Sequence, residues 1–127
     1  MRARDESGAA VVEFMLVSAL LTTLTLAIVQ LGLALLVRNT VVDAAAEGAR
    51  FASLADNSLA DGVARTTDLI GTALGPRYAQ DVSASAGSYL GHPAAVITVR
   101  APLPLFGLLG PDHALEVSGH AALEVID

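Results

Sequence analysis

FMLVSALLTTLTLAIVQLGLALLV, residues 14–37, is a run of 24 residues without Asp, Glu, Lys, Arg or His. As a helix with a rise of about 1.5 Å per residue it extends about 36 Å, which exceeds the roughly 30 Å of a bilayer's hydrocarbon core. The apolar region of a secretory signal is shorter, about 7 to 15 residues, and has different flanks. A helix that is apolar on all sides would also need more covering than the rest of this chain can provide. The run therefore predicts a membrane-spanning helix.

Polar side chains inside this run are few and uncharged. They are hydroxyls and one carboxamide: Ser18, Thr22, Thr23, Thr25 and Gln30. Such groups are tolerated in lipid and can hydrogen-bond to a neighbouring helix.

The composition fits a small domain attached to a membrane. Apolar residues make up 54% of the 127 residues and the mean hydropathy is +0.60, more than a soluble domain of this size needs. The chain has no cysteine, so an exported part must fold without disulfides. From Arg38 onward five arginines accompany ten acids, which argues against a nucleic-acid-binding surface. Arg2 and Arg4 precede the apolar run and Arg38 follows it, so the positive-inside rule favours a cytoplasmic N-terminus.

The helical pattern continues beyond the apolar run, because residues 38–56 contain good helix formers and no proline. We expect one helix from about Ala9 to about Leu54, with a membrane half and an exported half. The exported half has small residues at spacings that let another backbone approach: Ala44, Ala45, Gly48, Ala49, Ala52 and Ala55. They predict a helix-packing seam, centred on Ala45, Gly48, Ala49 and Ala52. The seam packs on the chain's own domain, on another subunit, or on both at different faces.

A second, shorter helix is expected after Ser58. The hydroxyl of Ser58 and the carboxylate of Asp61 are spaced as in a capping box, and Gly75 followed by Pro76 marks the end. Four apolar residues fall on one stripe of this helix: Leu59, Val63, Ile70 and Leu74. We therefore expect this helix to lie on the domain rather than in the bilayer.

The last third of the chain changes to the period of two that is typical of strands. Candidate strands cover residues 81–89, 94–101 and 114–126, and the last alternates most regularly. We expect an antiparallel sheet of about three strands that packs its apolar face on the first helix. The expected fold class is α+β, with a long N-terminal helix, a short second helix and a small C-terminal sheet. The apolar loop at 102–111 either completes the core or forms a docking surface.

A short polar segment with a glycine and an acid precedes the apolar run. In MRARDESGAAVVEFML, residues 1–16, Glu13 and Phe14 follow Gly8 after four intervening residues. This is the spacing of a type IV prepilin processing site. Gly8 would give a peptidase close access to the backbone, and the polar residues before it would keep the bond to Ala9 in water. The pattern predicts a leader that is removed after Gly8.

Cleavage there would create a charged partner for Glu13. A new α-amino group on Ala9 and the Glu13 carboxylate are both charged at neutral pH and lie one helical turn apart. Each charge is costly at the membrane border unless it is paired. If the amine belongs to a neighbouring subunit, the pair also fixes the register of helices in a bundle, because a misplaced helix leaves its charge unpaired. The alternative is a carboxylate that merely reaches the membrane surface from the end of the span.

These residues resemble the TadE-like pseudopilins of the tight-adherence, or Flp pilus, assembly system. The resemblance is carried by GAAVVEFMLV at residues 8–17 and ALLVRNTVVDAAAEGARFA at residues 34–52, and only in pattern by the tail. It implies a type IV pilin-like fold, cleavage between Gly8 and Ala9 by a dedicated prepilin peptidase, and a role in pilus assembly for adhesion or secretion. Phe14 stands where major Flp pilins usually carry tyrosine, and the exported part is larger than theirs. Both differences favour a minor pilin or pseudopilin.

The expected organisation has three parts. Residues 1–8 form the leader peptide, residues 9–38 the transmembrane helix and residues 39–127 an extracytoplasmic pilin-like domain. The chain is expected to cross the cytoplasmic membrane once, with its N-terminus inside, before it enters a pilus. The expected partners are the lipid bilayer, the prepilin peptidase, other pilin or pseudopilin subunits through the N-terminal helix, and the inner-membrane assembly platform. No nucleic acid, cofactor or metal is expected.

An enzyme and a simple anchored adaptor are the competing classes. His92, His113 and His120 lack metal-ligand spacing, and the sequence has no phosphate-binding loop and no nucleophile with a companion base. We therefore expect no catalytic residue. An uncleaved signal-anchored adaptor with a small exported interaction domain would share every feature except the need for Gly8 and Glu13 at their spacing. It stays the alternative.

Overall fold

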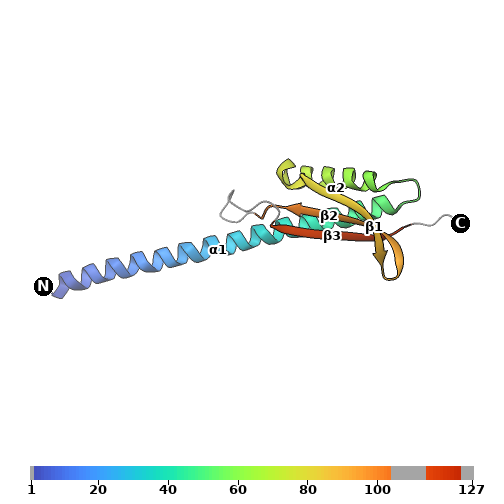
Figure 1. The fold of residues 1–127 in the computed structure, drawn as a ribbon. Coiled ribbons are helices and arrows are strands. Elements are labelled where there is room, and N and C mark those ends of the chain that lie inside the picture. Colours follow the sequence, from blue (N-terminus) through green and yellow to red (C-terminus); the bar gives the residue numbers. More distant parts are fainter. Residues whose placement is uncertain (1, 104–113, 124–127) are drawn as a thin grey trace.

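A long helix and a small domain built on its C-terminal half make up the protein. The computed structural model describes residues 2–103 and 114–123. Helix α1, Arg2–Ser53, is 52 residues long, and Figure 1 shows its N-terminal half extending alone from the domain. Within the described chain, the part of α1 from Glu6 to Ser53 is long and apolar enough to cross a membrane. The expected α+β fold with a long N-terminal helix, a short second helix and a three-stranded sheet is confirmed.

The start of α1 differs from the expected one. The helix begins at Arg2 rather than at about Ala9, while its end at Ser53 is close to the expected end at about Leu54. The residues before Gly8 include helix formers and no proline, and acids near a helix N-terminus are favourable. A single helical glycine costs only about 1 kcal/mol relative to alanine, so Gly8 does not interrupt the helix.

Helix α2, Leu59–Leu74, is held at its start by the predicted capping box. The Ser58 hydroxyl accepts a hydrogen bond from the Asp61 backbone N–H at 3.2 Å, and Asp61 Oδ2 accepts one from the Ser58 N–H at 2.7 Å. The helix ends before Gly75, whose φ of 102° suits glycine, and the 3₁₀ turn η1, Pro76–Ala79, follows. Both ends of α2 lie where the sequence predicted them.

The sheet is an antiparallel meander of strands β1, Asp81–Tyr89, β2, His92–Ala101, and β3, Leu115–Ala122, in the order β1-β2-β3. The bounds of β1 are those predicted, and β2 begins two residues earlier than predicted because its start pairs with the end of β1. The predicted last strand ran to residue 126. The described strand ends at Ala122, and residues 124–127 lie outside the described part of the chain.

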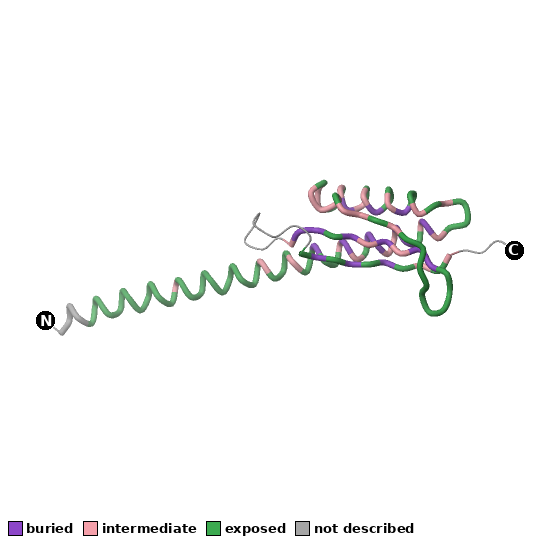
Figure 2. Tube along the Cα trace, in the orientation of Figure 1, coloured by how far each residue is buried: buried purple, intermediate pink, exposed green. Residues whose placement is uncertain are grey.

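Both helices cover the same face of the sheet, and the core lies between them and the strands (Figure 2). In the middle of that face Val82, Val99 and Val117 lie side by side on the three strands. Val41 of α1 and Ile70 of α2 complete this cluster, and both are fully buried. Along β3 buried residues alternate with exposed ones, as the sequence predicted.

Small residues let α1, α2 and the sheet approach closely. A Cβ added to Gly48 would lie 2.9 Å from the Gly62 carbonyl oxygen and closer still to the Thr66 hydroxyl, and one added to Gly119 would lie 2.5 Å from the Ala45 carbonyl oxygen. The α1 residues of the predicted seam are all buried in this domain: Ala45, Gly48, Ala49 and Ala52. Of the two contacts that the sequence left open, the structure shows packing on the chain's own domain.

The buried face of α2 differs in part from the predicted stripe. Ile70 is fully buried, but the other three members are only partly buried: Leu59, Val63 and Leu74. The buried residues of α2 are instead Gly62, Thr66 and Ile70, at intervals of four. Thr66 can be buried because its hydroxyl donates to the Gly62 carbonyl oxygen at 2.8 Å. The close approach of α1 selects small residues on this face, where the pattern of large apolar residues gives no signal.

The apolar loop predicted at 102–111 falls mostly outside the described residues. Leu103 is partly buried and packs against the core. Residues 104–113, which include His113, are not described.

Candidate functional site

The residues predicted for processing lie at the free end of α1. Gly8, Ala9, Glu13 and Phe14 are all helical and exposed, and Figure 2 shows this end of α1 far from the domain. A Cβ added to Gly8 would meet no atom within 4 Å. The bond between Gly8 and Ala9 is thus open to solvent, and a side chain at position 8 would not disturb the fold.

The backbone at this bond is helical in the uncut chain. In an α-helix each backbone N–H and carbonyl near the bond is engaged in a hydrogen bond along the helix axis. A peptidase that holds its substrate by backbone hydrogen bonds must first open this turn. Gly8 weakens it, because glycine loses more conformational freedom in a helix than any other residue.

Glu13 is exposed at the border between the polar end and the apolar run. It makes no hydrogen bond or ion pair among the side chains that the structure describes. Ala9 lies one turn before it on the same helix face, but the Ala9 nitrogen is an uncharged amide in the uncut chain. The geometry therefore brings the two predicted partners together, and their charges would pair only after cleavage. Phe14, which follows Glu13, has 72% of its surface exposed.

The apolar run is uncovered by the rest of the protein. All large apolar side chains from Val11 to Leu36 expose 40–72% of their surface. A core helix of a soluble protein would be mostly buried, whereas only 6% of the apolar window of α1 is buried. So long a bare apolar surface is unfavourable in water and is covered in lipid.

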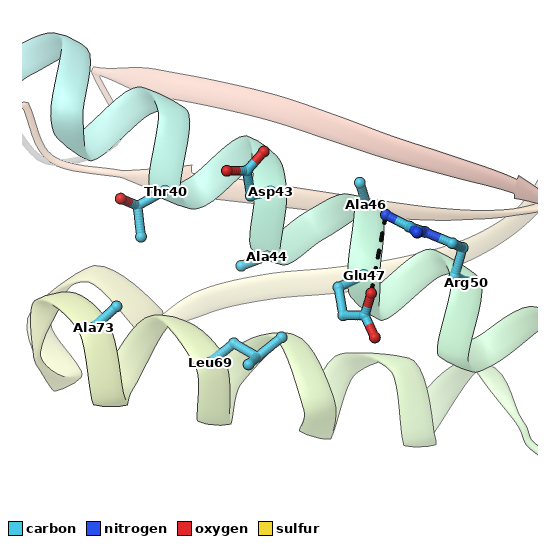
Figure 3. A pocket seen from close by; sticks show the side chains of 8 residues that line it. All are labelled: Thr40, Asp43, Ala44, Ala46, Glu47, Arg50, Leu69 and Ala73. Carbon is cyan, nitrogen blue, oxygen red and sulfur yellow. Dashed lines mark ion pairs between the residues drawn. The ribbon is translucent and has the colours of Figure 1, made fainter.

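A groove of about 450 Å³ lies between the C-terminal part of α1 and α2 (Figure 3). It is lined by Thr40, Asp43, Ala44, Ala46, Glu47, Arg50, Leu69 and Ala73. Glu47 and Arg50 form an exposed ion pair at its rim, with 3.9 Å between Glu47 Oε2 and Arg50 Nη2. Short and apolar side chains dominate the rest of the lining.

Histidines do not gather in the described domain. His120 stacks on Tyr89 on the outer face of the sheet, with 5.3 Å between ring centroids, and His92 is exposed at the start of β2. Among the described residues, no three His, Asp or Glu side chains are close enough together to hold a metal ion.

The sequence profile of the family described as TadE-like protein matches residues 8–50 of this chain. The match begins at Gly8, includes Glu13 and Phe14, covers the apolar run and reaches into the packed half of α1. The resemblance predicted from the sequence is confirmed over this segment, and the match suggests a role in a Tad/Flp pilus system. No curated protein and no solved structure gave a significant match.

Proposed function

We propose that this chain, as the match over residues 8–50 suggests, is a minor pilin or pseudopilin that a prepilin peptidase cleaves after Gly8. One observation carries the proposal. The glycine and the acid stand at prepilin spacing on the exposed end of a bare apolar helix, while the rest of that helix is packed into a folded domain.

Cleavage is the first step of the proposed function. The peptidase adds water across the bond between Gly8 and Ala9, which leaves a carboxylate on Gly8 and an α-amino group on Ala9. The bond lies in helical backbone, so the turn around it has to open first. Glycine at position 8 lowers the cost of that opening by about 1 kcal/mol relative to alanine.

Pairing of the new charge is the second step. The Ala9 amine is one turn from Glu13 of its own chain and can also meet the Glu13 of a neighbour. An unpaired charge at the membrane border is costly, so helices in a bundle settle in the register that pairs each amine with a carboxylate. This pairing guides the helix into the assembly.

The exported domain has a structural rather than an enzymatic role in this proposal. Its inner sheet face is already filled by α1 and α2, so the domain enters the assembly as a preformed unit. The chain crosses the cytoplasmic membrane once with its N-terminus inside. Its proposed partners are the prepilin peptidase, other pilin subunits and the inner-membrane assembly platform.

The test compares two glycines of α1. A Cβ meets nothing within 4 Å at Gly8 or at Gly32, so valine at either position leaves the fold unchanged. Gly8→Val should abolish the loss of the leader, measured by mass spectrometry on protein from membranes that contain the peptidase. Gly32→Val, which adds the same side chain inside the span, should be cleaved like the wild type.

Two results would contradict the proposal. Wild-type protein that keeps residues 1–8 in the presence of an active peptidase would favour the uncleaved adaptor. Equal cleavage of Gly8→Val and Gly32→Val would show that cleavage does not occur at this site.

A further inference from the structure

One polar atom in the apolar part of α1 has no partner. Gln30 lies within the run of exposed apolar side chains, and its Oε1 is shielded from solvent with no hydrogen-bond donor. A carboxamide oxygen that loses water without gaining a donor is unfavourable, and lipid offers no donor. The Gln30 side-chain oxygen therefore needs a hydrogen-bond donor.

The hydroxyls of the same segment differ from Gln30 in this respect. Thr23 Oγ1 donates to the Ala19 carbonyl oxygen and Thr25 Oγ1 to the Leu21 carbonyl oxygen, both at 2.8 Å. A hydroxyl can use the carbonyls of its own helix in this way. The Gln30 oxygen needs a donor, and backbone N–H groups inside a helix are already engaged. Its donor has to come from another molecule.

The helix face that carries Gln30 permits a close neighbour. Ala27 and Ala34 lie one turn before and one turn after Gln30 on this face, and small residues let a second backbone approach. The same face continues upward to Val37 and Val41, which are buried in the domain. The chain's own domain covers this face from Val37 onward, so a second helix can contact it only on the membrane side of Val37.

The chemistry of the carboxamide selects the partner. A glutamine side chain carries both an acceptor oxygen and an NH₂ donor, so two of them can satisfy each other. In two parallel copies related by a twofold axis, the two Gln30 side chains lie at the same depth in the bilayer and meet across the axis. The NH₂ group of Gln30 in a second copy therefore supplies the missing donor at the same depth in the bilayer, and no other polar residue is needed.

We propose that two copies of this chain pair in the membrane through reciprocal hydrogen bonds between their Gln30 side chains. The inference rests on the membrane-spanning placement of α1 in the proposed function, but not on cleavage. It predicts that the precursor is already paired before any pilus is assembled.

Site-directed cross-linking tests the pair directly, because the chain has no cysteine of its own. The full chain is reconstituted in phosphatidylcholine vesicles, and its insertion is checked by resistance to alkaline extraction. Ala34→Cys places a thiol on the Gln30 face, and Leu35→Cys places one at the same depth on another face. Oxidation should cross-link Ala34→Cys and leave Leu35→Cys largely monomeric.

The role of the carboxamide is then tested in the Ala34→Cys chain. Gln30→Leu keeps the size and removes the hydrogen bonds, and it should lower the cross-linked fraction by a factor of at least about three. Gln30→Asn, which keeps the carboxamide, should retain most of it. Thr25→Val is the matched control, since it removes a polar group on another face whose hydrogen bond stays within its own helix.

Failure of this inference is distinguishable from failure of the proposed function. An inserted chain that stays monomeric, or that cross-links equally with leucine at position 30, overturns the Gln30 pair alone. Cross-linking that needs a different pilin subunit also overturns it. A chain that alkali extracts from the vesicles contradicts the membrane placement, and with it the proposed function.

Discussion

At the scale of single residues, the five helical glycines that the structure describes and Gly119 of β3 fall into two groups. Three sit where an added Cβ would overlap neighbouring atoms: Gly48, Gly62 and Gly119. Three helical glycines have open space around them: Gly8, Gly32 and Gly71. The glycines of the first group allow the helices and the sheet of the domain to pack closely. Those of the second group are not required for packing. Gly8 is in the second group, which supports a role for it outside folding.

Gly48→Ala is predicted to destabilise the domain. The new methyl group would overlap the Thr66 hydroxyl and lie 2.9 Å from the Gly62 carbonyl oxygen, so α1 and α2 must separate. The expected loss of unfolding free energy is about 1–3 kcal/mol, measured by thermal unfolding of the full chain in detergent. Gly71→Ala is the control and should be neutral or slightly stabilising, because its Cβ meets no atom within 4 Å. Equal stabilities of the two variants would contradict the close contact.

Glu13→Gln is predicted to separate cleavage from assembly. Removal of the leader should continue, because Gly8 and the exposed bond are unchanged, but the new Ala9 amine is left without a carboxylate. Incorporation into pili should fall at least about tenfold, since an unpaired charge in such a pair costs more than about 1.4 kcal/mol. Glu6→Gln changes a charge in the leader and should assemble normally. Wild-type incorporation of Glu13→Gln would show that the pair has no role in assembly.

At the scale of elements, the sequence predicted what depends on local pattern. The capping box fixed the start of α2, Gly75 fixed its end, and the alternation in β3 gave the buried face of that strand. The sequence did not predict that α2 buries Gly62 and Thr66, because the burial of these two residues depends on how closely α1 approaches α2. A contact between two helices far apart in the sequence does not produce a periodic pattern of apolar residues in either of them.

The N-terminal end of α1 was mispredicted for a related reason. Polar residues before Gly8 suggested a leader separate from the helix, yet the helix includes them from Arg2 onward. The candidate site itself was predictable almost entirely, since it consists of residues 8–14 within one stretch of α1. That the bond between Gly8 and Ala9 lies in helical backbone followed only from the structure.

Ser58→Ala is predicted to weaken the start of α2. It removes the hydroxyl that accepts the Asp61 N–H, and loss of such a cap costs about 1 kcal/mol. Thermal unfolding in detergent measures the change. Thr72→Ala, on the exposed side of α2, removes a hydroxyl that makes no cap and should be neutral or slightly stabilising. A Ser58→Ala chain as stable as Thr72→Ala would contradict the role of the cap.

At the scale of the whole molecule, the bare half of α1 and the folded domain point in opposite directions (Figure 1). The hairpin between β1 and β2 turns at Leu90 and Gly91, which both have positive φ, and lies on the domain beyond the span. A chain inserted with its N-terminus inside therefore presents this hairpin to the outside.

Topology can be measured with single cysteines in this cysteine-free chain. Ser88→Cys in the exposed hairpin should react with a membrane-impermeant maleimide in intact spheroplasts. Ser7→Cys, placed in the uncleaved Gly8→Val chain, should react only after lysis. The reverse pattern would mean that the chain inserts the other way round, with its domain inside and its leader out of reach of a cytoplasmic peptidase site.

If this chain is a prepilin substrate as proposed, its mature form begins at Ala9. The most direct test is the intact mass of the wild-type protein recovered from membranes of a cell that contains an active prepilin peptidase. We expect a mass lower than that of the full chain by residues 1–8, with Ala9 as the first residue. A mass that still includes residues 1–8, with or without Met1, would contradict it.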